Sequence, residues 1–210
     1  ATLNALAGGW YGDSFSVLGL HRESGRRIVR TLQPKAGSVA LRVRGTSTLV
    51  PMQKVHPAGI FEADMPAHKR RYQLCISDAD GHSKEVEDAY AFPSMLGDLD
   101  LYLLGEGSHR EIYRKLGAHL ARSQGVDGAF FAVWAPNASR VSVIGGFNDW
   151  DGRCHVMRLH PGNGLWEIFI PGVVQGSQYK FELLDKQGQL LPLKSDPVGQ
   201  FYEAPPGNAS

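Results

Sequence analysis

Cysteine, long apolar runs and net charge are scarce in this sequence, and each scarcity excludes a class of protein. The two cysteines, Cys75 and Cys154, are far apart, so a disulfide framework is excluded. No run approaches the roughly 18 consecutive apolar residues of a membrane-spanning helix, so we expect no membrane contact. The net charge is only +1, which argues against a dedicated nucleic-acid-binding protein.

Basic residues nevertheless cluster in two places. One cluster is His68-Lys69-Arg70-Arg71, and the other is the set Arg22, Arg26, Arg27 and Arg30. They raise nucleic-acid binding as an alternative, but acidic residues balance them over the whole chain. We therefore interpret both clusters as solvated charges of strands and turns, and we expect no nucleic-acid partner.

Signatures of catalysis, metal binding and cofactor binding are also missing. There is no His-Glu-x-x-His helix, no Gly-x-Ser-x-Gly elbow and no phosphate-binding loop. Two acid pairs exist, Asp98 with Asp100 and Asp149 with Asp151, but a spacing of two directs side chains to opposite faces of an extended chain. We interpret them as loop acids, and we expect no catalytic residue, no metal and no cofactor in this chain. Without a secretion signal, a cytoplasmic location is expected.

Glycine and proline are plentiful. The 25 glycines and 12 prolines punctuate the 210 residues often, which favours many short strands over a few long helices. Hydrophobic residues make up 42% and charged residues 20%, as in an ordinary globular chain. The length suits one large domain or two modules of roughly 100 residues each.

A weak internal repeat runs through the chain, with an offset of roughly 100 residues. Leu18–His21 recurs as Leu116–His119, and Gly59–Glu62 recurs as Gly164–Glu167. Further matched pairs are Leu32-Gln33-Pro34 with Trp134-Ala135-Pro136, and Tyr72–Leu74 with Tyr179–Phe181. The repeat predicts one module written twice.

Each copy alternates apolar and polar residues with the two-residue period of a strand. Residues 130–134, 141–143, 165–170 and 179–183 show this period, and Asn163-Gly164 favours a hairpin between two of the strands. About seven short strands per copy predict an all-β protein of two tandem immunoglobulin-like β-sandwiches, with a closed barrel as the alternative.

A helical linker is expected between the copies. Ser108 and Glu111 form a capping-box pattern, and Ile112, Leu116 and Leu120 fall on one face of a helix over residues 108–120. The predicted domains are therefore 1–107 and 108–210.

A tryptophan in a polar loop is the most distinctive local feature. Trp150 stands in Gly145-Gly146-Phe147-Asn148-Asp149-Trp150-Asp151-Gly152. An exposed indole needs a flat apolar partner, and the C–H face of a pyranose ring is such a partner. Asn148 and Lys180 carry groups that bond to sugar hydroxyls. The alternative is that Trp150 packs into the core, whereas Phe147 is expected to be core in either case.

Several segments of the chain are similar to bacterial glycogen branching enzymes, from about residue 15 onward. They are Phe15–His21, Leu96–Gly107, Phe131–Ala138, Phe147–Trp150, Trp166–Gly172, Tyr179–Glu182 and Leu193–Pro197. The resemblance implies an N-terminal sandwich followed by a carbohydrate-binding module of family forty-eight. It also implies that retaining transglycosylation takes place in a downstream (β/α)₈ barrel, so this chain alone is expected to be inactive.

The resemblance also implies which residues bind glucan. The Phe-Asn-x-Trp tryptophan and the Tyr-Lys-Phe lysine match Trp150 and Lys180. A second sugar-contacting tryptophan follows a Gly-Gln pair in such modules, but here Gly188-Gln189 precedes Leu190. Losing one platform is expected to weaken binding by roughly 1–2 kcal/mol. Trp166 matches an apolar strand position and is expected to pack in the core or to face the barrel.

The expected function is to hold α-glucan chains near the catalytic barrel of the same polypeptide, which would form α-1,6 branches. The expected partners are therefore α-glucan and that barrel. The alternative is a free-standing glycogen-targeting module of a regulatory protein.

Overall fold

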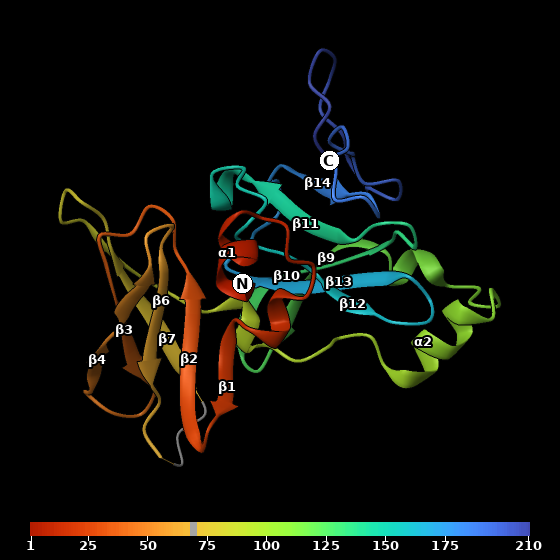
Figure 1. Cartoon of the computed structure of the whole chain (residues 1–210). Helices are drawn as coiled ribbons and strands as arrows, with labels where there is room; N and C mark the ends of the chain where they lie inside the picture. Colours follow the sequence, from red (N-terminus) through yellow and green to blue (C-terminus); the bar gives the residue numbers. More distant parts are fainter. Residues whose placement is uncertain (68–70) are drawn as a thin grey trace. The chain divides into compact units, whose positions relative to one another are not determined.

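The computed structural model describes residues 1–67 and 71–210, which form two compact units (Figure 1). The first unit comprises Ala1–Gly9 and Ser14–Phe92, and the second comprises Trp10–Asp13 and Pro93–Ser210. Antiparallel strands dominate both units, so the predicted all-β class is confirmed. The boundary between the units differs from the predicted one near residue 107.

The first unit contains two four-stranded sheets with the orders β1-β2-β6-β5 and β4-β3-β7-β8. Its strands are β1 (Gly19–Glu23), β2 (Arg26–Leu32), β3 (Ser38–Val43), β4 (Leu49–Pro51), β5 (Gln53–His56), β6 (Ile60–Asp64), β7 (Tyr72–Ser77) and β8 (Ser83–Val86). Helix α1 (Thr2–Ala7) and the 3-10 turns Ser14–Ser16 and Ala89–Ala91 complete it. Alternate residues of β3 and β7, such as Leu41 and Leu74, are buried, as the two-residue period predicts.

The second unit contains a sheet of order β12-β13-β10-β9 and a two-stranded sheet β11-β14. Its elements are helix α2 (Asp98–Gly105), the 3-10 turns Ile112–Arg114 and Gly146–Asn148, and strands β9 (Gly117–Ser123), β10 (Val126–Trp134), β11 (Arg140–Gly145), β12 (Arg158–His160), β13 (Leu165–Pro171) and β14 (Tyr179–Leu184). Side chains of the two sheets meet in a core, where the rings of Phe131 and Tyr179 lie 4.9 Å apart, edge to face. Trp166 is buried there as expected, with its Nε1 donating to the carbonyl of Ala135.

The two units share a strand order. Strands β1-β2-β6-β5 of the first correspond to β9-β10-β13-β12 of the second, and the pair β3-β7 corresponds to β11-β14. The repeated Leu-Gly-x-His motif has the same geometry in both copies. His21 and His119 each donate through Nε2 to a leucine carbonyl three residues earlier, at 2.7 and 2.9 Å. Glycine recurs in the motif because its φ there is +88° and +93°.

A buried tyrosine–aspartate pair also recurs. The Tyr72 hydroxyl donates to Asp88 at 2.6 Å, and the Tyr179 hydroxyl donates to Asp196 at 2.5 Å. Both aspartates are almost completely buried. The shared strand order and this shared pair support the expectation that the chain contains one module twice.

The predicted helix over residues 108–120 is wrong. Only a short 3-10 turn forms at Ile112–Arg114, and strand β9 begins at Gly117. Gly117 has a φ of +93°, which ends helical geometry, and Leu120 is exposed rather than packed. The helix of this region is instead α2, where the Gly97 N–H donates to Asp100 at 3.3 Å and caps the first turn.

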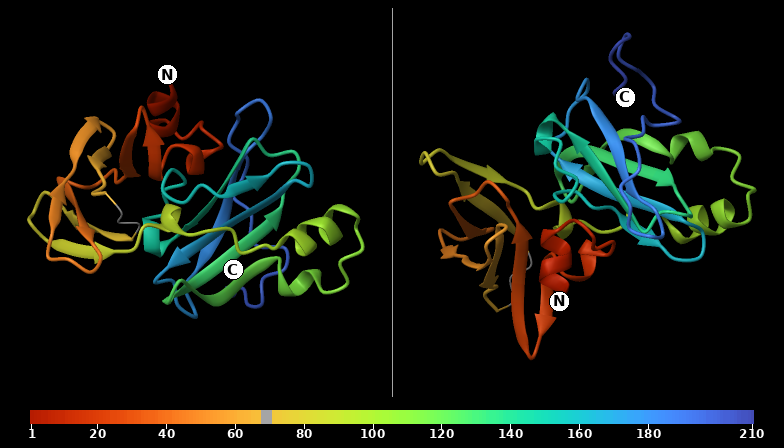
Figure 2. Two further views of the ribbon diagram at one scale, coloured as in Figure 1. Left: turned by 90° about the horizontal axis from the view of Figure 1, so that it is seen from below. Right: turned by 45° about the horizontal axis from the view of Figure 1, so that its top comes forward.

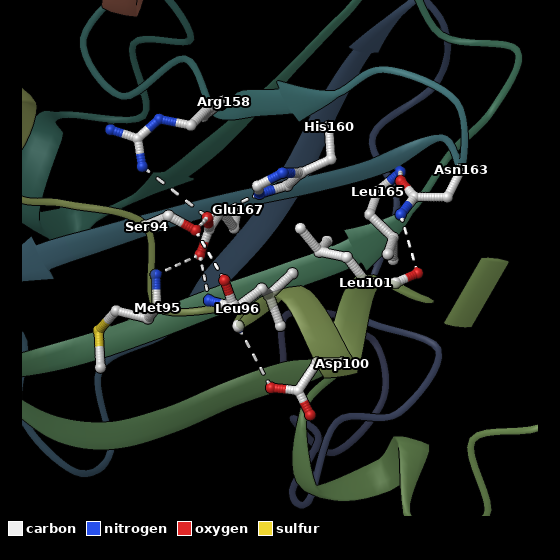
Figure 3. A network of polar contacts seen from close by, with 11 residues as sticks. Ser94, Met95, Leu96, Asp100, Leu101, Arg158, His160, Asn163, Leu165 and Glu167 are labelled. Carbon is white, nitrogen blue, oxygen red and sulfur yellow. Dashed lines mark hydrogen bonds and ion pairs between the residues drawn. The ribbon is translucent and has the colours of Figure 1, made fainter. Parts of the chain in front are cut away.

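The segment preceding α2 is held to the second unit by Glu167 of β13 (Figure 3). Its buried carboxylate accepts hydrogen bonds from Met95 N at 2.9 Å, Leu96 N at 3.2 Å and the Ser94 hydroxyl. His160 Nε2 lies 2.7 Å from the same carboxylate. Residues 93–107 therefore pack with the second unit, which explains why the boundary lies at Phe92–Pro93 rather than near residue 107.

Helix α2 lies beside the loop between β12 and β13 (Figure 2). The Asn163 amide of that loop donates to the carbonyl of Leu101 at 3.4 Å. The predicted hairpin at Asn163-Gly164 is present, with His160 paired to Leu165 across a four-residue loop. Among the described residues no helix is long and apolar enough to cross a membrane.

Candidate functional site

The loop that carries Trp150 begins where strand β11 ends. Gly145 is the last residue of β11 and pairs with Tyr179 on β14, next to Lys180. The Trp150 N–H donates back to the carbonyl of Gly145 at 3.0 Å, which closes a tight turn. The loop backbone is thereby anchored to the strand pair that carries Lys180.

Trp150 is exposed, with 41% of the residue accessible to solvent. The alternative in which it packs into the core is therefore excluded. Asp149 and Trp150 both have left-handed backbones, with φ of 57° and 59°. Phe147, three residues earlier, is partly buried, with its ring 6.4 Å from the core ring of Phe131.

Asn148 faces inward rather than toward solvent. Only 8% of this residue is exposed, its amide donates to Val143 O and His155 Nδ1, and its Oδ1 accepts from Gly145 N. The expectation that Asn148 bonds to sugar hydroxyls needs correction, because the loop already uses its donors and acceptor. Asn148 supports the loop from inside.

Lys180 lies on the outer face of β14. It pairs with Ile144, whereas its neighbours Tyr179 and Phe181 point into the core. The Lys180 ammonium donates to the side-chain oxygen of Asn208. A sugar hydroxyl at this position would share the ammonium with Asn208, since a lysine carries three donors.

Charged pairs surround the Trp150 loop. Arg140 of β11 pairs with Glu182 of β14, and Arg153 pairs with Asp151 through a contact of 2.7 Å. Burial alone would raise the pKa of Asp151, but the hydrogen bonds from Arg153 outweigh it and hold that pKa below its usual value. A Cβ at Gly152 would lie 1.9 Å from the Glu182 carboxylate, so a side chain at this position would displace the end of Glu182.

Two further tryptophans of the second unit are exposed, and neither was singled out from the sequence. Trp10 is 64% exposed and Trp134 is 62% exposed, both more than Trp150. Trp134 ends strand β10, and its Nε1 donates to the carbonyl of Asn163. The alternation over residues 130–134 does not say which face of the sheet is buried. The sequence therefore did not indicate that Trp134 is exposed.

Leu190, at the position where the resemblance implies a second tryptophan, is 60% exposed. It lies opposite Leu184 at the edge of β14. An aliphatic side chain offers less flat surface than an indole, so this position does not replace the missing platform.

One exposed group of described side chains, Asp78, Asp80 and His82, is close enough together to share a cation. The Asp78 carboxylate already accepts from the backbone N–H groups of Asp80 and His82, both at 2.9 Å. The turn itself explains this cluster, so it gives no ground for a metal site.

Several arginines of the basic clusters have acidic partners. Arg26 pairs with Asp64, and Arg30 pairs with both Glu23 and Glu62. Residues 68–70 of the other cluster lie outside the described residues. Arg26 is exposed and fits the interpretation as a solvated strand charge. For Arg30 that interpretation is wrong, because its side chain is buried and two carboxylates replace the solvent around it.

Comparisons with known proteins agree with the resemblance to branching enzymes. Residues 1–90 match the family described as "alpha-1,4-glucan branching enzyme GlgB, N-terminal domain". Residues 115–199 match "Carbohydrate-binding module 48 (Isoamylase N-terminal domain)".

Individual relatives extend this similarity across the chain. The 1,4-alpha-glucan branching enzyme GlgB of Rubrobacter xylanophilus is 50% identical over 208 residues, which cover 99% of this chain and 28% of that protein. The enzyme of the same name from Paramagnetospirillum magneticum is 48% identical over 207 residues, with the same two coverages. Among solved structures, the pullulanase from Bacillus acidopullulyticus is 13% identical at a TM-score of 0.35, covering 91% of this chain and 27% of that chain.

The chain thus spans little more than a quarter of the length of the branching enzymes it matches. The similarity to them covers both units without interruption. Residues 1–90 are therefore similar to branching-enzyme N-terminal domains, and residues 115–199 are similar to carbohydrate-binding module family 48.

Proposed function

We propose that this chain is the non-catalytic N-terminal region of a 1,4-alpha-glucan branching enzyme and that it binds α-glucan at Trp150. The observation that carries the proposal is the exposed indole on a tightly anchored loop of a carbohydrate-binding module. A pyranose ring covers such an indole with its apolar face, while its hydroxyls remain available for hydrogen bonds. Lys180, on the adjoining strand, supplies donors for these hydroxyls.

The role proposed for this binding is local concentration of substrate. A glucan chain held by the module stays close to a catalytic barrel in the same polypeptide, which raises its effective concentration there. Such a role belongs to glycogen synthesis in the cytoplasm. The alternative, a free-standing glycogen-targeting module, is less well supported, because the similarity to branching enzymes spans both units.

The first test compares Trp150→Ala with wild type in binding to glycogen and maltoheptaose. Covering about 60 Å² of apolar surface contributes roughly 1.5 kcal/mol, so the variant is expected to bind about tenfold more weakly. Because the indole is not in the core, the variant should unfold at the same urea concentration as wild type. Affinity electrophoresis and calorimetry measure binding, and circular dichroism measures unfolding.

Trp134→Ala is the matched control, because it removes an indole that is more exposed and lies in the same unit. It should bind glucan as wild type does. If Trp134→Ala weakens binding and Trp150→Ala does not, the proposed platform is at the wrong tryptophan. Lys180→Met keeps the aliphatic stem and should weaken binding by a smaller factor.

The second test concerns catalysis. The chain by itself should form no α-1,6 branches in amylose, measured by the iodine spectrum and by debranching of the product. The physical reason is that glycoside transfer needs two carboxylates placed across a sugar bond in a cleft. Branch formation by the purified chain would contradict the non-catalytic assignment.

A further inference from the structure

The backbone that presents Trp150 is strained. Asp149 and Trp150 are consecutive residues with φ of 57° and 59°, the left-handed region that L-residues rarely adopt. Two such residues in succession persist only where other contacts impose the conformation. The contacts in question come from inside the loop.

Asn148 ties the loop to its own base. Its Oδ1 accepts from Gly145 N at 2.9 Å, and its Nδ2 donates to Val143 O at 2.8 Å and to His155 Nδ1 at 2.8 Å. The Trp150 N–H bonds to the carbonyl of the same Gly145. Both amide hydrogens of Asn148 are therefore used, and an aspartate in its place would lack the donors that Val143 and His155 require.

His155 is the acceptor that completes this arrangement. Its ring lies 5.8 Å from that of Phe147, and burial lowers its pKa to about 4. Among the described residues no charged group adds to this shift. Those of the surrounding elements pair with each other, Arg140 with Glu182 and Asp151 with Arg153. At neutral pH the imidazole is uncharged, so its Nδ1 lone pair accepts the bond from Asn148.

We propose that Asn148 and His155 are positioning residues that hold the Trp150 indole ready for a glucan, and that protonation of His155 releases it. The inference rests on the proposed function, because it concerns the same site. Protonated His155 presents N–H to the Asn148 amide, so two donors face each other and the contact breaks. The loop then loses one of the contacts that fix Asn148, and the bonds of Asn148 to Gly145 and Val143 have to hold the left-handed residues without it.

The first experiment uses Asn148→Asp in the whole chain, with maltoheptaose binding measured by calorimetry at pH 8 and pH 6. At pH 8 the introduced carboxylate faces the carbonyl of Val143, and binding should fall about tenfold. The introduced carboxylate favours the imidazolium form of His155, so lowering the pH to 6 should pair the two charges and binding should recover several-fold. Asn137→Asp makes the same chemical change at an exposed residue of the same unit and should follow wild type at both pH values.

The second experiment uses His155→Gln. The glutamine oxygen accepts from Asn148 but takes up no proton in this range, so the variant should bind equally at pH 7 and pH 3.5. Wild type should weaken between these values in step with protonation of His155, followed by NMR. Other acids titrate in this range too, and a His155→Gln variant that weakens as wild type does would overturn the inference.

The outcomes separate the two proposals. If Trp150→Ala binds as wild type does, the proposed function fails and the inference falls with it. If Trp150→Ala loses binding while Asn148→Asp is equally weak at pH 8 and pH 6, or binds normally at both, only the inference fails. If Asn148→Asp does not fold, the acid titrations of wild type and His155→Gln decide.

Discussion

Glu167→Ala is expected to destabilise the second unit by about 3–5 kcal/mol, because it removes the acceptor for a set of buried donors. In the folded chain Glu167 is 1% exposed, and its carboxylate accepts from Met95 N, Leu96 N and the Ser94 hydroxyl. It also lies 3.8 Å from Arg158, whose pKa burial lowers. The alanine variant leaves these donors without an acceptor in a site from which water is excluded.

Tryptophan fluorescence in urea measures this effect cleanly. All four tryptophans of the chain, Trp10, Trp134, Trp150 and Trp166, belong to the second unit. Hydrogen exchange at the amides of Met95 and Leu96 should also accelerate, since these are the groups that lose their acceptor. Glu167→Gln keeps the shape but places an N–H₂ group among donors, so its loss should be intermediate.

Glu111→Gln is the control for loss of an acid in the same unit. Glu111 forms a surface ion pair with Arg114, with 57% and 62% of the two side chains exposed, and such pairs contribute roughly 0–1 kcal/mol. Its unfolding midpoint should match that of wild type. A Glu167→Ala variant as stable as this control would show that the segment before α2 is held by other contacts.

The second large effect is a dependence of the first unit on pH. Burial raises the pKa of Asp88 to about 6, although hydrogen bonds from Tyr72 and from the Tyr90 N–H lower it in part. The folded state thus prefers the protonated acid. The stabilisation by protonated Asp88 is fully present below the ordinary carboxyl pKa and is lost as pH rises through about 6. The free energy of unfolding that is lost is roughly 3 kcal/mol.

The first unit is therefore expected to be more stable near pH 4 than near pH 7 on account of Asp88. Methyl NMR signals of Leu41 and Leu74 during urea unfolding report on this unit separately. Asp88→Asn removes the titration and should flatten the dependence, whereas Asp80→Asn, at an exposed turn of the same unit, should leave it unchanged. Equal pH slopes for wild type and Asp88→Asn would contradict the assignment.

The second unit should respond to acid in the opposite direction. Burial would raise the pKa of Glu167, but hydrogen bonds from His160, Ser94 and Met95 outweigh it and keep that pKa below its usual value. A lowered pKa means that the stabilisation is present above the ordinary carboxyl range and is lost as pH falls. The two buried acids thus have opposite effects on the pH dependence of stability. Folding favours the protonated form of Asp88 and the charged form of Glu167.

Local patterns were sufficient for much of the fold. The alternation around Phe131 and Trp166 and the turn at Asn163-Gly164 predicted strands and a hairpin that the structure contains. Strands and hairpins depend on backbone geometry within a few residues. The alternation of apolar and polar side chains and the choice of turn residues reflect that geometry directly. The helical prediction at residues 108–120 failed, because a helical spacing of apolar residues carries less weight than the left-handed Gly117 and the strand pairing that follows it.

The candidate site was only partly accessible to the same reasoning. The composition of the loop indicated that Trp150 is unusual, and the resemblance to branching enzymes indicated Lys180. Neither indicated that Asn148 points inward, because its orientation depends on His155 and on the end of β11. The exposure of Trp10 and Trp134 also follows from their surroundings rather than from their neighbours in the chain.

The amino-acid sequence alone was enough to predict a strand-dominated architecture and a similarity to branching enzymes, because these follow from short-range periodicity and contiguous motifs. The attachment of residues 94–96 to Glu167, at separations of 71 to 73 residues, emerged only from the folded chain. The inward orientation of Asn148 also emerged only from the folded chain. The same holds for the opposite ionisation preferences of Asp88 and Glu167. A buried polar group takes its partners and its pKa from what folding brings against it, and such long-range contacts leave no local signal in the chain.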